Sequence, residues 1–250
     1  MNVKLILLRH GESTWNFENR FTGWTDVGLT QNGKNEAKKA GNLLIKENFK
    51  IDKVYVSFLK RAIETSKICL NQLNINENKV EYDWRLNERH YGNLQGLNKA
   101  ETAKKFGDKQ VLTWRRSYDT PPPPLSKNDK RHPKYDDLYK DVEKELLPSS
   151  ESLKDTLKRV KPLWKNQILP KLIIGENILI VAHGNSLRAI VKMLKNLSNE
   201  DILNLNIPTG YPYVFSFNEK FDLMNDEYLG SKDEISTKTK LVADQTNKQP

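Results

Sequence analysis

Short apolar runs alternate with amphipathic stretches along most of the chain. Residues 5–8 (Leu-Ile-Leu-Leu) and 178–182 (Ile-Leu-Ile-Val-Ala) are uninterrupted apolar runs, which are typical of strands buried on both faces. Shorter apolar runs predict three further strands, the last of which would end the sheet: residues 54–57, 80–84 and 213–217. Apolar residues at helical spacing predict helices between them: from Thr30, over residues 62–73 and 153–168, and after Asn185.

This alternation predicts an α/β fold, with three αβα layers around a mostly parallel, doubly wound sheet. We expect a single domain over residues 1–230. Residues 98–148 are polar and contain four consecutive prolines, so they are expected to form an ordered cap over the carboxyl ends of the strands. Residues 231–250 carry few apolar anchors and are expected to form a mobile C-terminal tail. Pro162 should bend or interrupt the helix that contains it.

Two of the predicted strands end in a histidine followed by a glycine. His10 and His183 would emerge where ligands bind in open α/β sheets, beyond the carboxyl ends of the strands. Arg9 supplies a fork-shaped cation suited to phosphate, and Gly11 would let the backbone approach a ligand. Asn185 is a candidate N-cap for a helix whose N-terminus would attract an anion. One such strand end could be an ordinary polar end of a core strand, but the pair favours phosphoryl chemistry with His10 as acceptor.

Charge and cysteine content narrow the class of protein. The net charge of +9 would fit a nucleic-acid binder, but the lysines are scattered among acidic neighbours, which favours a solvated basic surface that steers small polyanions. The single cysteine, Cys69, cannot form an internal disulfide, so we expect a cytoplasmic protein. Neither a secretory leader nor a segment long enough to span a bilayer is expected. No cluster of cysteine and histidine has metal-ligand spacing, so no metal site is expected.

Residues 9–16 (Arg-His-Gly-Glu-Ser-Thr-Trp-Asn), together with residues 183–185 (His-Gly-Asn), resemble the histidine phosphatase superfamily. Residues 86–92 (Leu-Asn-Glu-Arg-His-Tyr-Gly), the paired arginines at 115–116 and the four prolines at 121–124 narrow the resemblance to the cofactor-dependent phosphoglycerate mutase family. The resemblance covers nearly the whole chain. Further segments that fit are residues 21–26, 59–63, 114–118 and 147–153.

The resemblance implies an isomerase of glycolysis and gluconeogenesis that interconverts 3-phosphoglycerate and 2-phosphoglycerate. Its cofactor would be 2,3-bisphosphoglycerate, which primes a phosphohistidine at His10, and no metal would take part. Arg9 and Arg61 would clamp the phosphoryl group, with His183 donating to the same oxygens. Glu88 would act as general acid and base in turn. The family's phosphate and carboxylate contacts would fall on Ser13, Asn16, Thr22, Gly23, Arg89, Tyr91, Lys99, Arg115, Arg116, Gly184 and Asn185.

Two protonation states follow from these roles. Nearby arginines disfavour the imidazolium, so His10 should be neutral in the free protein, with one ring nitrogen donating to a backbone carbonyl. Arg89 would lower the pKa of Glu88 and a bound phosphate would raise that pKa; we expect the phosphate to dominate.

Other functions remain open from the sequence. In the related bisphosphoglycerate synthases the position of Ser13 is typically glycine, so Ser13 favours the mutase, with synthase and phosphatase activities as side reactions. A broad-specificity histidine phosphatase would lack the paired arginines and the proline-rich cap. A catalytically silent scaffold is disfavoured because Arg9, His10, Arg61, Glu88 and His183 are all present, and a nucleic-acid binder because no recognition motif is found. The expected partners are small anionic phosphoglycerates and, by resemblance, further copies of the chain in a homodimer or homotetramer.

Overall fold

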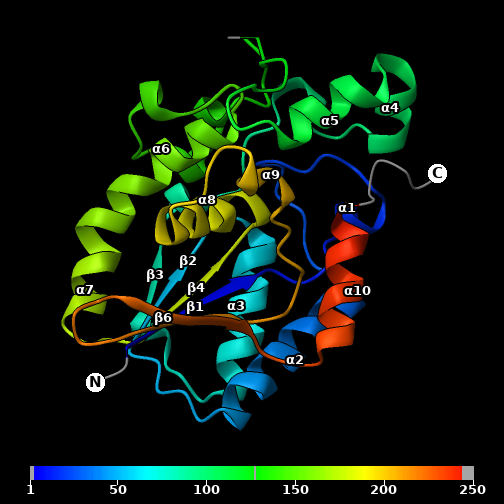
Figure 1. Cartoon of the computed structure of the whole chain (residues 1–250). Helices are drawn as coiled ribbons and strands as arrows, with labels where there is room; N and C mark the ends of the chain where they lie inside the picture. Colours follow the sequence, from blue (N-terminus) through cyan, green and yellow to red (C-terminus); the bar gives the residue numbers. More distant parts are fainter. Residues whose placement is uncertain (1–2, 127, 244–250) are drawn as a thin grey trace.

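The computed structural model describes residues 3–126 and 128–243, and in this part of the chain a six-stranded sheet forms the centre (Figure 1). The strand order is β3-β2-β4-β1-β5-β6. Neighbours from β3 to β1 pair in parallel, while β5 runs antiparallel to both β1 and β6. The strands are β1 (Val3–Arg9), β2 (Lys53–Val56), β3 (Val80–Tyr82), β4 (Ile178–Ala182), β5 (Tyr213–Phe217) and β6 (Leu223–Tyr228).

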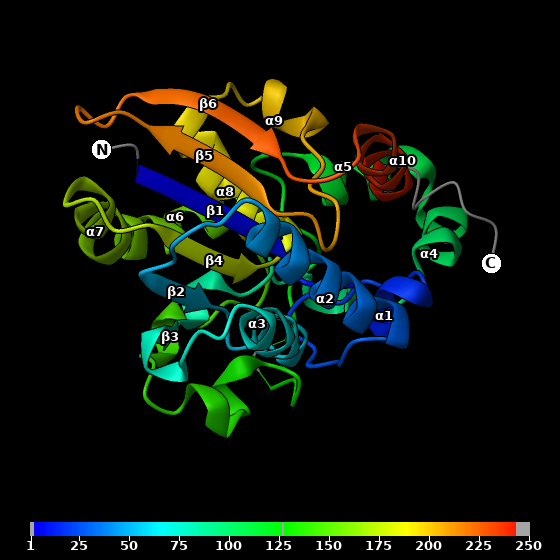
Figure 2. The same ribbon diagram turned by 90° about the horizontal axis from the view of Figure 1, so that it is seen from below.

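Helices cover both faces of the sheet, which confirms the three-layer α/β prediction (Figure 2). Alternate residues of β1 point to opposite faces: Leu5 and Leu7 pack in the core with α6–α8, and Ile6 and Leu8 in the core with α2 and α3. Both faces of β1 are therefore apolar, as its uninterrupted run of hydrophobic residues predicts. The covering helices are α2 (Gln31–Lys46) and α3 (Lys60–Gln72) on one face, and α6 (Leu153–Leu163), α7 (Leu169–Ile173) and α8 (Gly184–Lys195) on the other.

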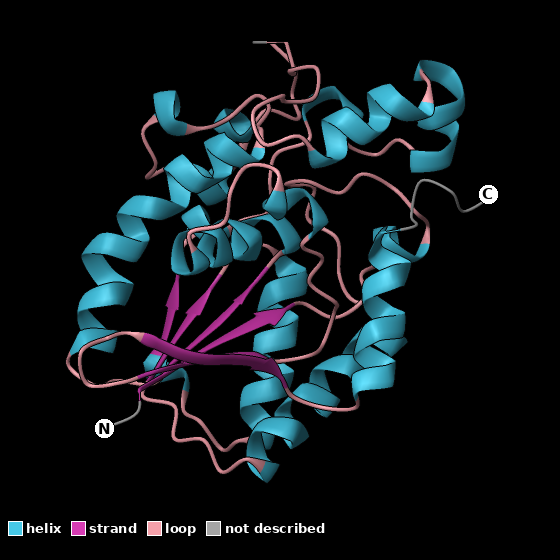
Figure 3. Cartoon of the chain, viewed as in Figure 1, coloured by secondary structure: helices cyan, strands magenta, loops and turns pink. Residues whose placement is uncertain are grey.

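The remaining helices lie mainly around the carboxyl ends of the strands (Figure 3), and residues 98–126 and 128–148, the segment predicted as a cap, lie beyond these ends (Figure 1). These helices are α1 (Thr14–Phe17), α4 (Lys99–Phe106), α5 (Asp108–Arg116), α9 (Asp201–Asn204) and α10 (Lys232–Ala243). Short 3-10 turns span Glu77–Lys79, Trp84–Leu86, Gly92–Leu94, Pro133–Tyr135, Asp137–Tyr139 and Lys144–Leu146. None of the helices in the described ranges has the length and apolar character needed to cross a membrane.

Two details of the fold differ from the sequence prediction. The strand at 213–217 is not the last one, because β6 follows it and forms the edge of the sheet. Helix α6 continues through Pro162, and the change in hydrogen bonding comes later: residues Trp164–Ile168 are π-helical, ending with the Leu169 N–H bonded to the Trp164 carbonyl. The wider turn falls just before Pro170, which has no N–H to donate.

The segment expected to be a C-terminal tail contains a helix. Residues 232–243 form α10, which runs alongside α2 with its C-terminal end toward the cap (Figure 1). Residues 244–250 of that segment lie outside the described residues. Helix α2 begins where predicted, because the Thr30 hydroxyl accepts the N–H of Gly33 at 3.0 Å as an N-cap.

Candidate active site

His10 follows the last residue of β1 and is buried, with both ring nitrogens in contact with protein groups. Nδ1 donates to the Gly11 carbonyl at 2.7 Å, and Nε2 accepts the Nε–H of Arg61 at 3.3 Å. Burial, followed by the charges of Arg61 and Arg9, holds the pKa of His10 well below its ordinary value. The hydrogen bond from Nδ1 to a carbonyl agrees with the predicted tautomer, and the lowered pKa favours a neutral ring, in which Nε2 carries a lone pair suited to attack on phosphorus.

Two arginines flank His10. Arg61 lies in the first turn of α3, as predicted, and its other nitrogens donate to the carbonyls of Thr25 at 3.0 Å and Gly23 at 2.8 Å. Burial lowers the pKa of Arg61 to about 10, so the guanidinium stays charged at neutral pH. Arg9 donates to the Ile207 carbonyl at 2.7 Å, and within the described residues its buried Nε has no hydrogen-bond partner. Arg9 therefore keeps one buried donor for an anion.

Glu88 reaches the site from the loop after β3. Its Oε1 accepts the backbone N–H groups of Arg89 at 2.8 Å and Asn185 at 3.1 Å. The Arg89 guanidinium turns away from Glu88, because it donates to the Tyr91 hydroxyl at 3.0 Å and the Arg115 carbonyl at 2.8 Å. The backbone of Arg89, rather than its side-chain charge, contacts the Glu88 carboxylate.

His183 follows β4, and its ring centroid lies 4.9 Å from that of His10. It is the N-cap of α8, so the prediction that Asn185 caps this helix is wrong. The helix already begins at Gly184 because the Ser186 hydroxyl, one turn on, accepts the His183 backbone N–H at 3.2 Å. His183 Nε2 contacts the Ser57 hydroxyl at 2.8 Å. Burial and then Arg61 hold the pKa of His183 well below its ordinary value.

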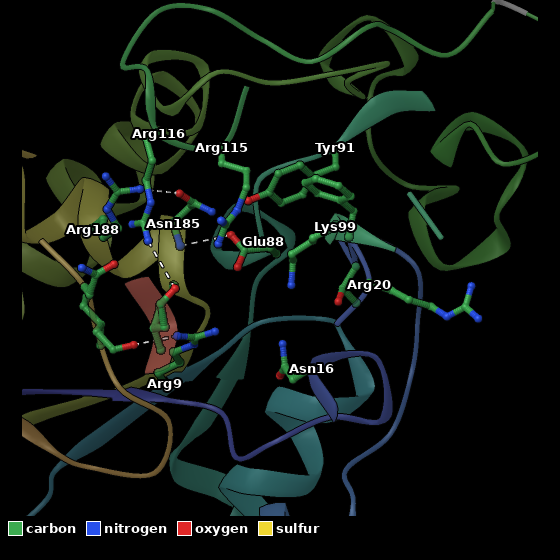
Figure 4. Close-up of a pocket in the computed structure, with 17 residues that line it drawn as sticks. Arg9, Asn16, Arg20, Glu88, Tyr91, Lys99, Arg115, Arg116, Asn185 and Arg188 are labelled. Carbon is green, nitrogen blue, oxygen red and sulfur yellow. Dashed lines mark hydrogen bonds between the residues drawn. The ribbon is translucent and has the colours of Figure 1, made fainter. Parts of the chain in front are cut away.

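Beside these residues a cavity of about 70 Å³ lies between the strand ends, the cap and the end of α10 (Figure 4). Its lining is rich in cationic side chains that converge from several elements, and Glu88 is its one carboxylate among the described residues. The predicted residues in the lining are Arg9, Asn16, Thr22, Gly23, Glu88, Tyr91, Lys99, Arg115, Arg116, Gly184 and Asn185.

The structure does not bring every predicted residue into that lining. His10, Arg61 and His183 are buried and are not part of it. Ser13 is also buried, because it caps α1 through hydrogen bonds with Asn16. Arg89 is fully buried behind Tyr91, with which its guanidinium stacks.

Gly11 permits close packing of its loop on α2, because a Cβ atom at this position would lie 2.2 Å from the Gly33 carbonyl oxygen. The approach of the Gly11 backbone to a ligand stays a prediction.

Sequence reasoning missed several residues of the lining: Arg20, Phe21, Arg188, Asn206, Ile207 and Val242. Arg188 donates to the Asn185 side-chain oxygen at 2.8 Å and to the Ile202 carbonyl at 2.6 Å. Burial, then Arg116 and Arg89, lowers the pKa of Arg188 to about 9. Arg188 could have been predicted from its position one helical turn after Asn185. Val242 could not, because it lies far in sequence from the other residues of the site.

The described residues contain no group of three or more His, Cys, Asp or Glu side chains that could hold a metal ion.

Solved structures with the same fold include a mycobacterial hydrolase ("Mycobacterial hydrolase 1"), with a TM-score of 0.70 and 21% identity, covering 92% of this chain and 100% of that one. The α-ribazole phosphatase from Shigella flexneri has a TM-score of 0.66 at 21% identity, covering 92% and 96%. At such low identity these likenesses establish the fold alone.

Sequence relatives are much closer. The 2,3-bisphosphoglycerate-dependent phosphoglycerate mutase of Parabacteroides distasonis is 54% identical over 244 residues, covering 98% of each chain. The enzyme of that name from Elusimicrobium minutum is 52% identical, covering 98% of this chain and 99% of its own. The model of the histidine phosphatase superfamily (branch 1) matches residues 5–224. The chain therefore belongs to the histidine phosphatase superfamily, and within it to the family of 2,3-bisphosphoglycerate-dependent phosphoglycerate mutases.

Proposed function

We propose that this protein interconverts 3-phosphoglycerate and 2-phosphoglycerate through a phosphohistidine at His10. The observation that carries the proposal is the state of His10: a neutral imidazole whose unprotonated Nε2 faces a guanidinium, next to a cationic cavity. A nucleophile needs that lone pair, and phosphoryl transfer needs positive charge around the equatorial oxygens. Arg9 and Arg61 are the cations beside His10 that would supply this charge.

The cavity suits an anion with more than one charged group. Burial, followed by the charge of Arg116, lowers the pKa of Arg115 to about 10, which reflects cations that crowd together away from water. Buried nitrogens of Arg9 and Arg188 have no hydrogen-bond partner in the described part of the chain. Such groups favour a ligand that brings several acceptor oxygens.

The same residues fit 2,3-bisphosphoglycerate as primer. Arg9 and Arg61 would hold the phosphate next to His10, and the arginines of the cap and α8 would hold the other end of the molecule. When bound, the primer supplies the phosphoryl group that charges His10. Glu88 would hold the proton that passes to and from the substrate oxygen, with its carboxylate oriented by two backbone N–H groups.

A mutase must also keep water away from the phosphohistidine. The cavity of about 70 Å³ is smaller than the ~300–1,000 Å³ of ordinary ligand sites, and Val242 of α10 lines it. Arg116 contacts the Val242 carbonyl at 3.4 Å. We infer that α10 and the cap open to admit substrate and close over it, which favours the mutase over a phosphatase.

Ser13 supports the mutase over the bisphosphoglycerate synthase. It caps α1 and hydrogen-bonds to Asn16, which lines the cavity. A glycine at this position would lose both contacts. We also propose a cytoplasmic location, consistent with the single buried thiol of Cys69, and a homodimer or homotetramer, as the resemblance implies.

The test is to incubate the protein with 3-phosphoglycerate, with and without a trace of 2,3-bisphosphoglycerate, and to follow 2-phosphoglycerate and orthophosphate. We expect rapid isomerisation that depends on the primer. Orthophosphate without isomerisation would identify a phosphatase, and accumulation of the bisphosphate would identify a synthase. No turnover and no acid-labile phosphate on the protein would identify a scaffold.

A further inference from the structure

The hydrogen bonds behind His183 determine which of its ring nitrogens carries a proton. The deduction starts at Asn87, which is fully buried. Its Oδ1 accepts the backbone N–H of Phe58 at 3.1 Å. A backbone N–H can only donate, so this atom is the amide oxygen and not the nitrogen. The amide nitrogen of Asn87 points the other way, to the Tyr139 hydroxyl at 2.9 Å.

Ser57 connects this amide to His183. Its hydroxyl lies 2.8 Å from Asn87 Oδ1, which only accepts, so the single hydroxyl hydrogen points at Asn87. The Ser57 oxygen accepts the Leu59 N–H at 3.1 Å and also contacts His183 Nε2 at 2.8 Å. With its hydrogen already used, Ser57 can only accept from Nε2. His183 therefore carries its proton on Nε2.

This tautomer is opposite to that of His10, which carries its proton on Nδ1 because that nitrogen faces a carbonyl. In neutral His183 the lone pair lies on Nδ1, a buried atom without a hydrogen-bond partner among residues 3–126 and 128–243. With Nε2 turned to Ser57 and the two rings 4.9 Å apart, Nδ1 is the nitrogen left to meet an anion bound at His10. A lone pair would repel the oxygens of that anion.

The charges around His183 favour its neutral form as long as no anion is bound. Arg9 approaches it from the end of β1, His10 from the residue after that strand, Arg61 from α3 and Arg159 from α6, and all of them disfavour an imidazolium. Glu88 is the one carboxylate of the described residues beside this end of α8, where it accepts the Asn185 N–H. A bound dianion would offset the arginines and offer an acceptor to a protonated Nδ1.

We propose that Ser57 and Asn87 are positioning residues that hold His183 as the Nε2–H tautomer, so that His183 takes up one proton on Nδ1 when a phosphate-like anion binds. The N–H bond on Nδ1 forms with a proton from a buffer acid, whose own bond to hydrogen breaks to leave the conjugate base, and no other covalent bond changes. The inference rests on the proposed function only in taking His10 as the place where the anion binds.

The test is nuclear magnetic resonance of the imidazole nitrogens in the full-length, ¹⁵N-labelled protein. The chain has four histidines, so His10 and His183 can be assigned with single variants. Sulfate is the probe, because its own protonation does not change near neutral pH. Without sulfate we expect His183 to be neutral and protonated on Nε2. With saturating sulfate we expect both of its nitrogens to be protonated, while the His10 signals shift.

Two variants separate positioning from a merely structural role. In Ser57→Ala the tautomer should shift toward Nδ1–H, since nothing then fixes Nε2 as donor. Ser57→Thr keeps the hydroxyl and should keep the wild-type spectrum. The sulfate dissociation constant of the wild type should rise with pH, because binding takes up a proton. This rise should be steeper than that of Ser57→Ala by about a factor of ten per pH unit, which corresponds to one proton.

The proposal is overturned if His183 of the wild type carries its proton on Nδ1, if it stays neutral with sulfate bound, or if sulfate perturbs neither ring. These measurements need no turnover. A protein that passes them but does not isomerise phosphoglycerates would contradict the proposed function and leave this inference intact.

Discussion

His10 is hydrogen-bonded at both ring nitrogens before any substrate binds, and hydrogen bonds also fix Arg61 and Glu88. Arg61 is bonded to two loop carbonyls, and the Glu88 carboxylate to two backbone N–H groups. These bonds use groups that the fold positions in any case, so the site needs little reorganisation when a phosphoryl group is transferred. At the residue scale, the proposed reaction requires that the His10 imidazole accepts the phosphoryl group.

We expect His10→Ala to lower isomerisation by at least roughly 10³-fold, because the phosphoryl acceptor is lost. The variant should fold normally, since the loss of a small buried polar group here leaves the β1 core intact. Initial rates and thermal unfolding measure the two effects. His132→Gln, which changes a histidine of the cap, is the matched control and should keep wild-type rates. Appreciable isomerisation by His10→Ala would exclude His10 as the carrier.

A buried ion pair supports the backbone on both sides of Glu88. Arg159 and Glu151 meet at 2.7 Å, with side-chain exposures of 5% and 4%. Arg159 also donates to the carbonyls of Arg85 at 2.7 Å and Glu88 at 3.3 Å, and Glu151 accepts the His90 N–H at 2.9 Å. The pair thus fixes the loop that carries Glu88, the residue proposed as general acid and base.

We therefore predict that Glu151→Ala lowers the free energy of unfolding by about 3–5 kcal/mol, because it leaves a buried guanidinium unpaired. Urea unfolding measures the change. Glu77→Ala, in the exposed pair of Lys67 and Glu77, is the control and should cost less than ~1 kcal/mol. A loss of less than ~1 kcal/mol in Glu151→Ala as well would mean that the buried pair does not stabilise the loop.

Among the elements, α10 is held differently from the core helices. None of its described residues is buried, and polar contacts attach it to α2. Glu234 pairs with Lys39 at 2.5 Å, and Lys238 pairs with Glu36 at 2.7 Å. Glu36 in turn accepts the N–H of Glu12, two residues after His10, at 2.8 Å. The Lys39–Glu234 pair is exposed and contributes little, whereas the Lys238–Glu36 pair has a buried carboxylate. Because α10 itself buries no described residue, it can leave the site without disturbing the core.

Deletion of all residues after Gly230 should lower mutase activity while sparing or raising the phosphatase activity, because water would then reach the phosphohistidine. Parallel assays of 2-phosphoglycerate and orthophosphate measure the ratio. Lys238→Gln should shift the ratio in the same direction, whereas Lys240→Gln, an exposed change on the same helix, should not. Full mutase activity with unchanged hydrolysis in the truncated protein would contradict gating by α10.

At the scale of the whole molecule, the sequence predicts the elements that have a clear hydrophobic pattern. It misses residues whose roles depend on tertiary contacts. The buried runs before His10 and His183 predicted two strands of a mostly parallel sheet, and hence a site at the carboxyl ends of the strands; that the two strands are neighbours is seen only in the structure. Strand β6 was missed because it is an exposed edge strand whose residues carry no clear alternation. Ser57 was missed because its role depends on Asn87 and His183, partners far away in sequence that only the folded chain brings together. Arg188 was missed although it lies one helical turn after Asn185, which its side chain contacts.

Buried histidines also make the stability of the whole molecule depend on pH. Burial lowers the pKa of His90 to about 3, and burial likewise holds the pKa of His10 and His183 well below 6.5. Below pH 6.5 the unfolded chain binds protons that the folded chain does not, so the free energy of unfolding must fall as pH falls. Each of these histidines adds about 1.4 kcal/mol per pH unit to that slope.

Unfolding titrations in urea between pH 7.5 and 5, without phosphate or sulfate, test this dependence. We expect a plateau above pH 6.5 and a decline below it. His90→Asn should reduce the slope by about 1.4 kcal/mol per pH unit. A free energy of unfolding that stays constant from pH 6.5 to 5 would show that these histidines are not buried in neutral form.

The most direct test of the central claim is to locate the phosphoryl group on the protein. The protein is incubated with 2,3-bisphosphoglycerate in the presence of a chelator, quenched in base and digested, and the modified peptide is identified by mass spectrometry. We predict acid-labile phosphate on His10, formed equally well with and without chelator and lost when 3-phosphoglycerate is added. Phosphate on another residue, or labelling that vanishes with the chelator and returns with magnesium or manganese, would contradict the account.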